Sequence, residues 1–382
     1  MSTSRPTVSV VVPTRNRAPL LQRTLAALGA LRGDDIEILV SDNRSTDATR
    51  RVLRSVDDAR LRVVEPPQPL GAVDHWEFAV AQARGEWVTV LGDDDALVPA
   101  LLDVVGRDLS AGRRVVAWQK AWYVHPDLDP AWPDPDEENV LYVEPWTGCR
   151  RDVSARDELV RFFRRQERRE RPEMNALVHR DVLDEIRRRA DRVFRGPDPA
   201  VGMCAAVLAV EASYLAVEAP LTVMGLSASS ISTAVSRRLT LVHDVVREYE
   251  AGDGRVGRVP LASRCLPNLV AETLAAVKDS LPNELDGIDL DPVAYYVTCR
   301  EAMGDADVAE WRRCLRSEPA AVRRAVRATL RSRGLRTAAR RAVHSTPVGR
   351  RLVARVRGGA GERARLHIVE GGSAGFSDLA GA

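Results

Sequence analysis

The sequence of 382 residues has few cysteines, few lysines and no long apolar run. Its five cysteines lie far apart and form no Cys-x-x-Cys pair, which argues against a disulfide framework or a zinc site and favours a reducing compartment. No stretch approaches the roughly 18 consecutive apolar residues of a membrane-spanning helix. The apolar stretch near the N-terminus is too short and too β-branched for a signal-peptide core, so we expect a cytoplasmic protein.

Lysine occurs only at positions 120 and 278, so the basic charge is almost entirely arginine. Residues 313–357 hold 14 arginines and one acidic residue, Glu318, although the whole chain carries only +2. The rest of the chain is therefore acidic. A GC-rich genome would explain the arginine content without any function, and the bidentate geometry of arginine toward phosphate is the functional alternative.

Strand and helix patterns alternate along the first hundred residues. Runs typical of buried strands occur at Val8–Pro13, Ile36–Val40, Leu61–Val64 and Trp87–Leu91, with helical spacing between them. This order predicts an α/β fold with a mostly parallel sheet and helices on both faces. Ligands of such sheets bind beyond the carboxyl ends of the strands.

The rest of the chain divides into three parts. Residues 113–230 contain further strands and an apolar helix from Ala200 to Ala212, with an irregular loop from His125 to Trp146. Residues 237–357 have helical patterns, and the remainder is rich in Gly, Ala and Ser, which is typical of disorder. We therefore predict domains at 1–235, 236–357 (helical) and 358–382 (disordered).

Acidic side chains follow two of the predicted strands. Asp42 ends the second, and Asp93, Asp94 and Asp95 follow the fourth. Three adjacent carboxylates repel one another, and a Mg²⁺ or Mn²⁺ ion with hard oxygen ligands would offset that repulsion. The alternative is a solvated Asp-rich turn or helix start.

Three sequence blocks resemble family-2 glycosyltransferases of the GT-A (Rossmann-like) fold. They are Val11–Arg17 (VVPTRNR), Asp42–Thr49 (DNRSTDAT) and Gly85–Pro99 (GEWVTVLGDDDALVP). The resemblance covers residues 7–105 well and 106–230 loosely. It implies a nucleotide-diphosphate sugar donor, UDP- or dTDP-linked, a Mn²⁺ or Mg²⁺ ion, and inversion at the anomeric carbon.

The same resemblance implies roles for individual residues. The donor would be bound by Asp42 at the nucleobase, Asp93 near the ribose, and Pro13, Thr14, Arg15, Arg17 and Asn43 around the nucleotide. The metal ligands would be Asp94 and Asp95. Many members carry Asp where this chain has Gly92, which leaves the register of the ligands open among the three aspartates.

An inverting transfer also needs a general base for the acceptor hydroxyl. The Glu-Asp pair that many members carry is missing, and the closest match is Asp198, which precedes the apolar helix. Asp191 and Asp152 are weaker candidates. The alternative is a simple helix cap, with Asp198 followed by a proline. The missing pair also keeps open a non-catalytic nucleotide-sugar-binding module.

The arginine-rich segment predicts basic amphipathic helices. Val322, Val326 and Leu330 share one helical face, while arginines occupy another. The segment Arg323–Arg357 would pack on the acidic body or contact anionic lipid on the inner face of the membrane. We expect no nucleic-acid partner, because no nucleic-acid-binding fold accompanies the charge. An arginine-rich membrane-surface adaptor is therefore a further alternative.

The acceptor is open, with a cell-envelope glycan, a lipid-linked glycan and a secondary metabolite as candidates. Aromatic faces suit stacking on sugars, and four tryptophans lie within or beside the 125–146 loop, at positions 118, 122, 132 and 146. Each of them is also a candidate for ordinary core packing. The sequence does not choose between these roles.

Overall fold

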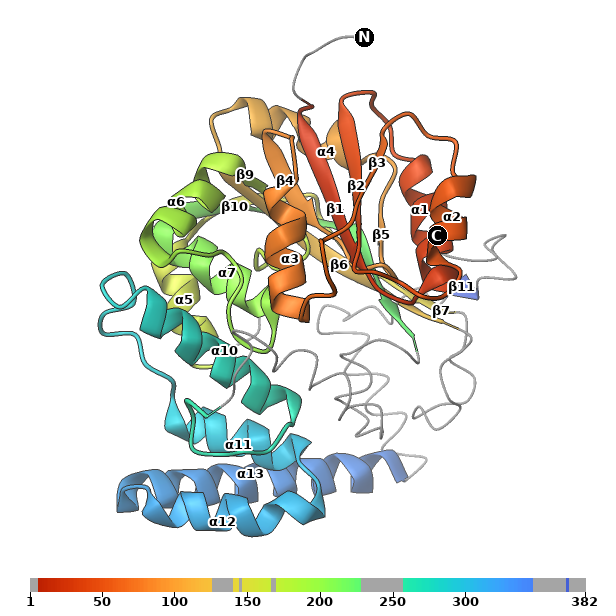
Figure 1. Ribbon diagram of the computed structural model, residues 1–382. Helices are drawn as coiled ribbons and strands as arrows, with labels where there is room; N and C mark the ends of the chain where they lie inside the picture. Colours follow the sequence, from red (N-terminus) through yellow and green to blue (C-terminus); the bar gives the residue numbers. More distant parts are fainter. Residues whose placement is uncertain are drawn as a thin grey trace.

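The structure is a computed structural model that describes residues 6–125, 140–143, 146–165, 170–227, 257–345 and 369–370. The described strands form one 11-stranded sheet with helices on both faces (Figure 1). A helical C-terminal region packs at one side of the sheet domain. The predicted α/β fold with a helical C-terminal region is thus confirmed.

The N-terminal half of the sheet is parallel. Its strands are β1 (Val8–Thr14), β2 (Ile36–Asp42), β3 (Leu61–Val64) and β4 (Trp87–Val90), in the order β4-β1-β2-β3. They are connected through α1 (Ala18–Gly29), α2 (Thr49–Ser55) and α3 (Ala72–Ala81). Every residue of β1 and β2 is buried, as expected for apolar runs covered on both faces. The carboxyl ends of β1, β2 and β4 therefore meet at one edge.

Beyond β4 the pairing is largely antiparallel, which the sequence did not predict. Strand β9 (Ala176–His179) lies between β4 and β6 (Val115–Val124) and is antiparallel to both. Strand β10 (Ser213–Leu226) is parallel to β6 but antiparallel to β5 (Ala96–Leu97) and β8 (Arg150–Ser154). The short strand β7 (Val140–Tyr142) follows, paired with β11 (Val369–Glu370). An apolar run shows that a strand is buried but not which way it runs.

Two hydrophobic clusters fill the two faces of the sheet. One contains residues of α1, α2 and α4 (Leu101–Ser110). The other contains residues of α3, α5 (Ala155–Phe163), α6 (Arg180–Ala190) and α7 (Pro199–Val210). The predicted apolar helix corresponds to α7, whose residues from Val201 to Leu208 are all buried.

The C-terminal helices belong to two cores. Helix α10 (Leu266–Ser280) packs on α7 and adds Val270, Leu274 and Val277 to the main cluster. The others form a separate cluster; they are α11 (Pro292–Ala302), α12 (Val308–Ser317) and α13 (Ala320–Ser345), with a 3-10 turn at Asp305–Asp307. The predicted boundary at 235/236 lies outside the described residues, as does the predicted disordered segment 358–382 apart from β11.

Candidate functional site

A buried charge cluster joins the carboxyl ends of β1 and β4. The Arg17 guanidinium lies 2.6 Å from Asp93 Oδ1 through Nη1 and 2.8 Å from Asp94 Oδ2 through Nη2. The Thr14 hydroxyl donates to Asp93 Oδ2 at 2.6 Å, and the Ser227 hydroxyl donates to Asp94 Oδ2 at 3.1 Å. We call these residues the strand-end cluster: Thr14, Arg17, Asp93, Asp94 and Ser227.

The strand-end cluster collects more negative charge than its one arginine balances. Both aspartates are buried, with exposed fractions of 3% for Asp93 and 7% for Asp94. Burial raises the pKa of Asp93, and the Arg17 charge opposes that rise. The two carboxylates therefore converge on one cationic group, and their hard oxygens suit a second cation such as Mg²⁺ or Mn²⁺.

Asp95 does not join this cluster. Its Oδ1 accepts the Gly225 N–H at 2.8 Å and its Oδ2 accepts the Gly92 N–H at 3.2 Å. Burial and the neighbouring Asp94 charge raise the pKa of Asp95. Both oxygens thus hold β10 against the β4–β5 turn, so Asp95 is less suited to bind a metal than the sequence suggested.

The end of β2 supplies a second polar position. Asp42 is fully buried; its Oδ1 accepts the Ser45 N–H at 2.9 Å, whereas its Oδ2 has no donor among the described residues. A buried acceptor without a donor is costly, which suits a ligand that brings one. The Asn43 amide, in contrast, is engaged with Leu70, donating to its O at 2.8 Å and accepting its N–H at 2.9 Å.

Pro13 and Arg15 border the same edge. Pro13 is buried in β1 opposite Ser41 of β2. The Ser41 hydroxyl lies 2.9 Å from His75 Nε2, a buried contact beneath the edge that the sequence analysis missed. Burial lowers the pKa of His75 to about 4, and the charge of half-buried Arg15 acts in the same direction.

Asp198 lies at the N-cap of α7, on a different element from the residues of the strand-end cluster. Its Oδ1 accepts the Val201 N–H at 3.1 Å, and its own N–H donates to Thr273 Oγ1 at 3.0 Å. Burial raises the pKa of Asp198 to about 6, with the Glu173 charge adding to the rise and Lys120 opposing it. The cap that the sequence offered as the alternative is thus present, and the carboxylate also titrates close to neutrality.

The weaker base candidates are more exposed. Asp191 is an exposed residue at the C-cap of α6, and Asp152 is an exposed residue of β8 paired with Arg113. Neither lies in a buried polar environment of the kind that tunes a catalytic carboxylate.

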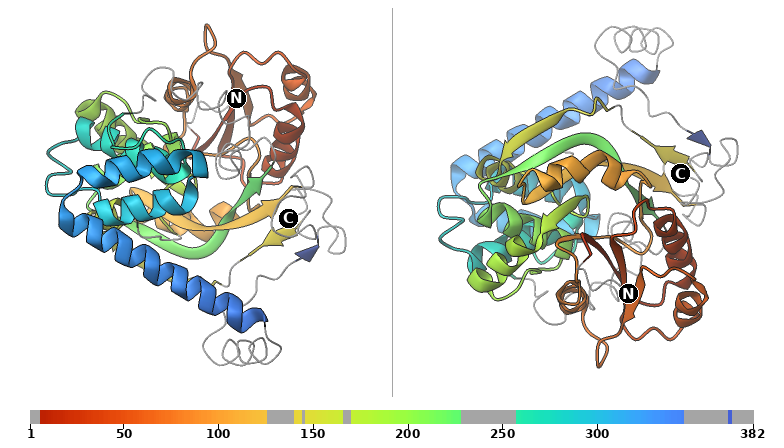
Figure 2. Two further views of the ribbon diagram at one scale, coloured as in Figure 1. Left: turned by 90° about the horizontal axis from the view of Figure 1, so that it is seen from below. Right: turned by 90° about the horizontal axis from the view of Figure 1, so that it is seen from above.

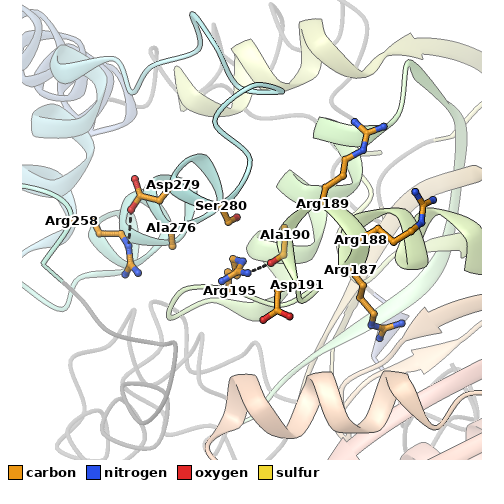
Figure 3. A pocket seen from close by; sticks show the side chains of 10 residues that line it. All are labelled: Arg187, Arg188, Arg189, Ala190, Asp191, Arg195, Arg258, Ala276, Asp279 and Ser280. Carbon is orange, nitrogen blue, oxygen red and sulfur yellow. Dashed lines mark hydrogen bonds and ion pairs between the residues drawn. The ribbon is translucent and has the colours of Figure 1, made fainter.

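A separate cleft of about 520 Å³ lies between α6 and α10. Figure 3 shows the side chains that line it. Arginines dominate its lining, but several already have acidic or carbonyl partners: Arg187 with Glu77, Arg189 with Glu284, Arg258 with Asp279, and Arg195 with the Ala190 carbonyl. It contains no residue of the strand-end cluster, so we do not take it as the active site.

Residues 9–187 match the family model of glycosyl transferase family 2. The chain thus contains a glycosyl transferase family 2 domain, which covers a little under half of its residues. The match spans β1 to α6 and so includes the strand-end cluster apart from Ser227.

Curated relatives align with this chain over short segments. A GalNAc(5)-diNAcBac-PP-undecaprenol beta-1,3-glucosyltransferase of Campylobacter jejuni is 34% identical over 110 residues, which are 28% of this chain and 36% of the relative. A validoxylamine A glucosyltransferase of Streptomyces hygroscopicus subsp. jinggangensis is 53% identical over 60 residues, 15% and 14% of the two chains. The aligned part is thus about a third of the first relative and a seventh of the second.

Solved structures resemble this chain more distantly. The structure of S. aureus TarS 1-349 in complex with UDP-GlcNAc has a TM-score of 0.45 and 13% identity, over 81% of this chain and 79% of that one.

The tryptophans near the 125–146 loop fall in different environments. Trp118 is fully buried and donates its indole N–H to Thr222 Oγ1 at 2.8 Å. Trp122 and Trp146 are 40% and 56% exposed, and Trp132 lies outside the described residues. The structure thus leaves Trp122 and Trp146 available to a ligand.

Proposed function

We propose that this chain transfers a sugar from a nucleotide-diphosphate sugar, UDP- or dTDP-linked, to an acceptor hydroxyl with inversion. The observation that carries the proposal is the strand-end cluster, in which two buried aspartates and Arg17 meet where the family-matched sheet binds ligands.

Donor binding is assigned to the edge formed by β1, β2 and β4. Asp42 would accept an N–H of the nucleobase through its Oδ2, which has no donor among the described residues. Asp93 and Thr14 would contact the ribose, and Arg17 would face the diphosphate, because a guanidinium matches phosphate oxygens in pairs. Pro13 and Arg15 border this site, while Asn43 supports it by holding the loop at Leu70.

We assign the proposed metal ion to Asp94 and Asp93, and not to Asp95, which the sequence analysis also offered as a ligand. Asp94, with Asp93 beside it, would hold a Mg²⁺ or Mn²⁺ ion, since their oxygens already converge on a cation. When bound, the ion would neutralise charge on the departing diphosphate. Asp95 would instead support the site by accepting the backbone N–H groups of Gly92 and Gly225.

Asp198 is proposed as the general base. A pKa of about 6 leaves the carboxylate ionised at neutral pH, yet still basic enough to take a proton as the acceptor oxygen attacks. The Val201 N–H, which donates to the Asp198 carboxylate, and the Thr273 hydroxyl, which accepts the Asp198 backbone N–H, hold the residue in place at the start of α7.

A lipid-linked or cell-envelope glycan is the acceptor class we favour, because one relative is named for an undecaprenol-linked substrate. None of the helices in the described part of the chain has the length and hydropathy of a bilayer-spanning segment. Helix α13 would instead contact the surface of an anionic membrane through its exposed residues Arg324, Arg327 and Arg331. Figure 2 shows this helix running along one side of the molecule.

A thermal-shift panel tests the donor site. UDP, dTDP, GDP and their sugars are each added with and without Mn²⁺, because a ligand of the native state raises its stability by mass action. We expect a metal-dependent rise in Tm with UDP or dTDP that is lost in Asp94→Asn. The control is Asp103→Asn, an exposed aspartate of α4. A flat panel on folded wild-type protein would contradict the proposal.

A further inference from the structure

A row of large side chains crosses three neighbouring strands beyond the catalytic residues proposed above. Trp122 of β6 lies opposite Met224 of β10 and opposite Tyr142 of β7. Residues opposite one another in adjacent strands project from the same face of a sheet. Met224, Trp122 and Tyr142 therefore form one row, which we call the aromatic row.

The burial of their neighbours determines which face carries the aromatic row. Ala121 and Tyr123 belong to a buried cluster with Ala27 of α1. Because side chains alternate along a strand, Lys120 and Trp122 project from the opposite face. The exposure along β6 agrees: Trp122 is 40% exposed, whereas Ala121 and Tyr123 are 2% and 1% exposed.

The same face leads to the proposed base. Lys120 Nζ lies 2.5 Å from Glu173 Oε2, so Glu173 also lies on this side of β6. Helix α7, which Asp198 caps, packs on the face of the sheet opposite to α1. Asp198 therefore lies on the same side of the sheet as Lys120 and Glu173. Trp122, two residues beyond Lys120 in β6, therefore projects from the face of the sheet that α7 and Asp198 occupy.

We propose that the aromatic row, with Trp122 as its main contact, binds the acceptor by stacking under a pyranose ring. This inference rests on the proposed transferase function and names the part of the site that receives the acceptor. A half-exposed indole offers a flat apolar face beside water, which matches the C–H face of a sugar. Lys120 and Glu173 lie alongside to hydrogen-bond the ring hydroxyls.

The other tryptophans do not share this placement. Trp118 is enclosed in the core, with its indole N–H already donated to Thr222. Trp146 is exposed but lies beside the middle of β10 and not in the row at Met224, since Gly148, two residues later, donates its N–H to the Glu218 carbonyl. Trp146 thus provides a matched control.

The first experiment is binding without turnover. Methyl glycosides of glucose, galactose and N-acetylglucosamine are titrated into UDP-loaded full-length protein, and intrinsic tryptophan fluorescence is followed. We expect at least one glycoside to change the emission of the wild type and of Trp146→Phe, but not of Trp122→Phe. No response of the wild type to any glycoside, or an equal response in Trp122→Phe, would overturn the proposal.

The second experiment separates acceptor from donor. With p-nitrophenyl glycosides as acceptors, Trp122→Ala should raise the acceptor KM about tenfold, which corresponds to losing about 1.4 kcal/mol of stacking. The donor KM and the UDP-induced Tm shift should stay unchanged, and Trp146→Ala should behave as wild type. An unchanged acceptor KM in Trp122→Ala would overturn the acceptor assignment alone. If UDP does not raise the Tm of the wild type at all, the result would instead count against the transferase function.

Discussion

The carboxylate of Asp198 caps α7 and is also the general base that we propose. Substitution Asp198→Asn keeps an acceptor for the Val201 N–H but removes the proposed base, so we expect transfer to fall about 100- to 10,000-fold. Wild-type turnover should also decline as the pH falls below about 6, because the base is then protonated. The pH–rate profile and the UDP-induced Tm shift, which should persist in the variant, check this.

The same substitution makes a prediction about stability. Burial raises the pKa of Asp198 from 3.8 unfolded to about 6 folded, so stability is lost as the pH rises from about 4 to about 6. Asp198→Asn removes that loss, and its Tm should exceed that of wild type at pH 8 but not at pH 4. Asp291→Asn, at the N-cap of α11, is the control and should leave transfer unchanged. A variant that is less stable than wild type at pH 8 would contradict the prediction.

Arg17 is the cation that the two buried aspartates share. Arg17→Gln leaves Asp93 and Asp94 unbalanced; breaking a buried pair costs roughly 3–5 kcal/mol, and because Arg17 is 19% exposed we expect about 2 kcal/mol. Mn²⁺ should then raise the Tm of the variant more than that of wild type, since it replaces the missing charge. Chemical denaturation measures the loss in free energy of unfolding, and thermal unfolding with and without Mn²⁺ measures the change in Tm.

The control for that prediction is Arg32→Gln. Its ion pair with Asp103 is exposed on both sides, at 69% and 58%, and exposed pairs contribute only about 0–1 kcal/mol. An Arg17→Gln variant as stable as the Arg32→Gln variant would show that the strand-end cluster does not need its arginine.

At the scale of elements, the close approach of β10 to the β4–β5 turn shapes the site. A Cβ added to Gly225 would lie 1.9 Å from the Asp94 carbonyl oxygen, so backbone would have to move. Gly225→Ala should therefore lower stability by about 2 kcal/mol or more and abolish the UDP-induced Tm shift. Gly106→Ala is the control. A Cβ added at this position in α4 would meet no atom within 4 Å outside the backbone of its own helix, so the variant should be stabilised by about 0.5–1 kcal/mol.

Sequence patterns predicted the elements better than their pairing. The β-branched runs of β1 and β2 and the apolar residues of α7 marked buried elements correctly. The antiparallel insertion of β9 between β4 and β6 was missed, because pairing direction depends on where the chain returns in space. Likewise, adjacency made Asp93, Asp94 and Asp95 look equivalent, whereas the backbone turn directs Asp95 to the N–H groups of Gly92 and Gly225.

At the scale of the whole molecule, α10 links the sheet domain to the C-terminal helices. Leu274 is fully buried in the main cluster, so Leu274→Ala should cost about 2–5 kcal/mol. Because α10 and α7 share this core, thermal unfolding followed by circular dichroism should shift as one transition. A loss confined to a separate, earlier transition would show that the helical region unfolds independently.

The arginines of α13 lead to a prediction about surfaces. Val326 is buried and Val322 and Leu330 pack beside it, so this apolar face is already used within the protein. Contact with lipid should then be electrostatic, contributing roughly 1 kcal/mol per arginine. Replacing Arg324, Arg327 and Arg331 with Gln should weaken binding to phosphatidylglycerol vesicles about 100-fold, as measured by co-sedimentation. High salt should weaken the binding of the wild type in the same way.

The matched control uses three exposed arginines of α2, Arg50, Arg51 and Arg54. Their replacement with Gln changes the net charge equally but should leave vesicle binding intact. Equal losses in the two triple variants would mean that net charge alone, and not α13, drives the contact.

The sequence by itself determined the strand runs, the helical C-terminal region and the edge where the acidic residues gather, because these depend on local periodicity and on the rule that parallel strands end together. Only the tertiary structure decided which side chains meet there. It paired Asp93 and Asp94 with Arg17, turned Asp95 to the backbone and enclosed Trp118 while leaving Trp122 half exposed. The reason is physical: the direction and burial of a side chain depend on contacts between residues far apart in the chain, which no local pattern records.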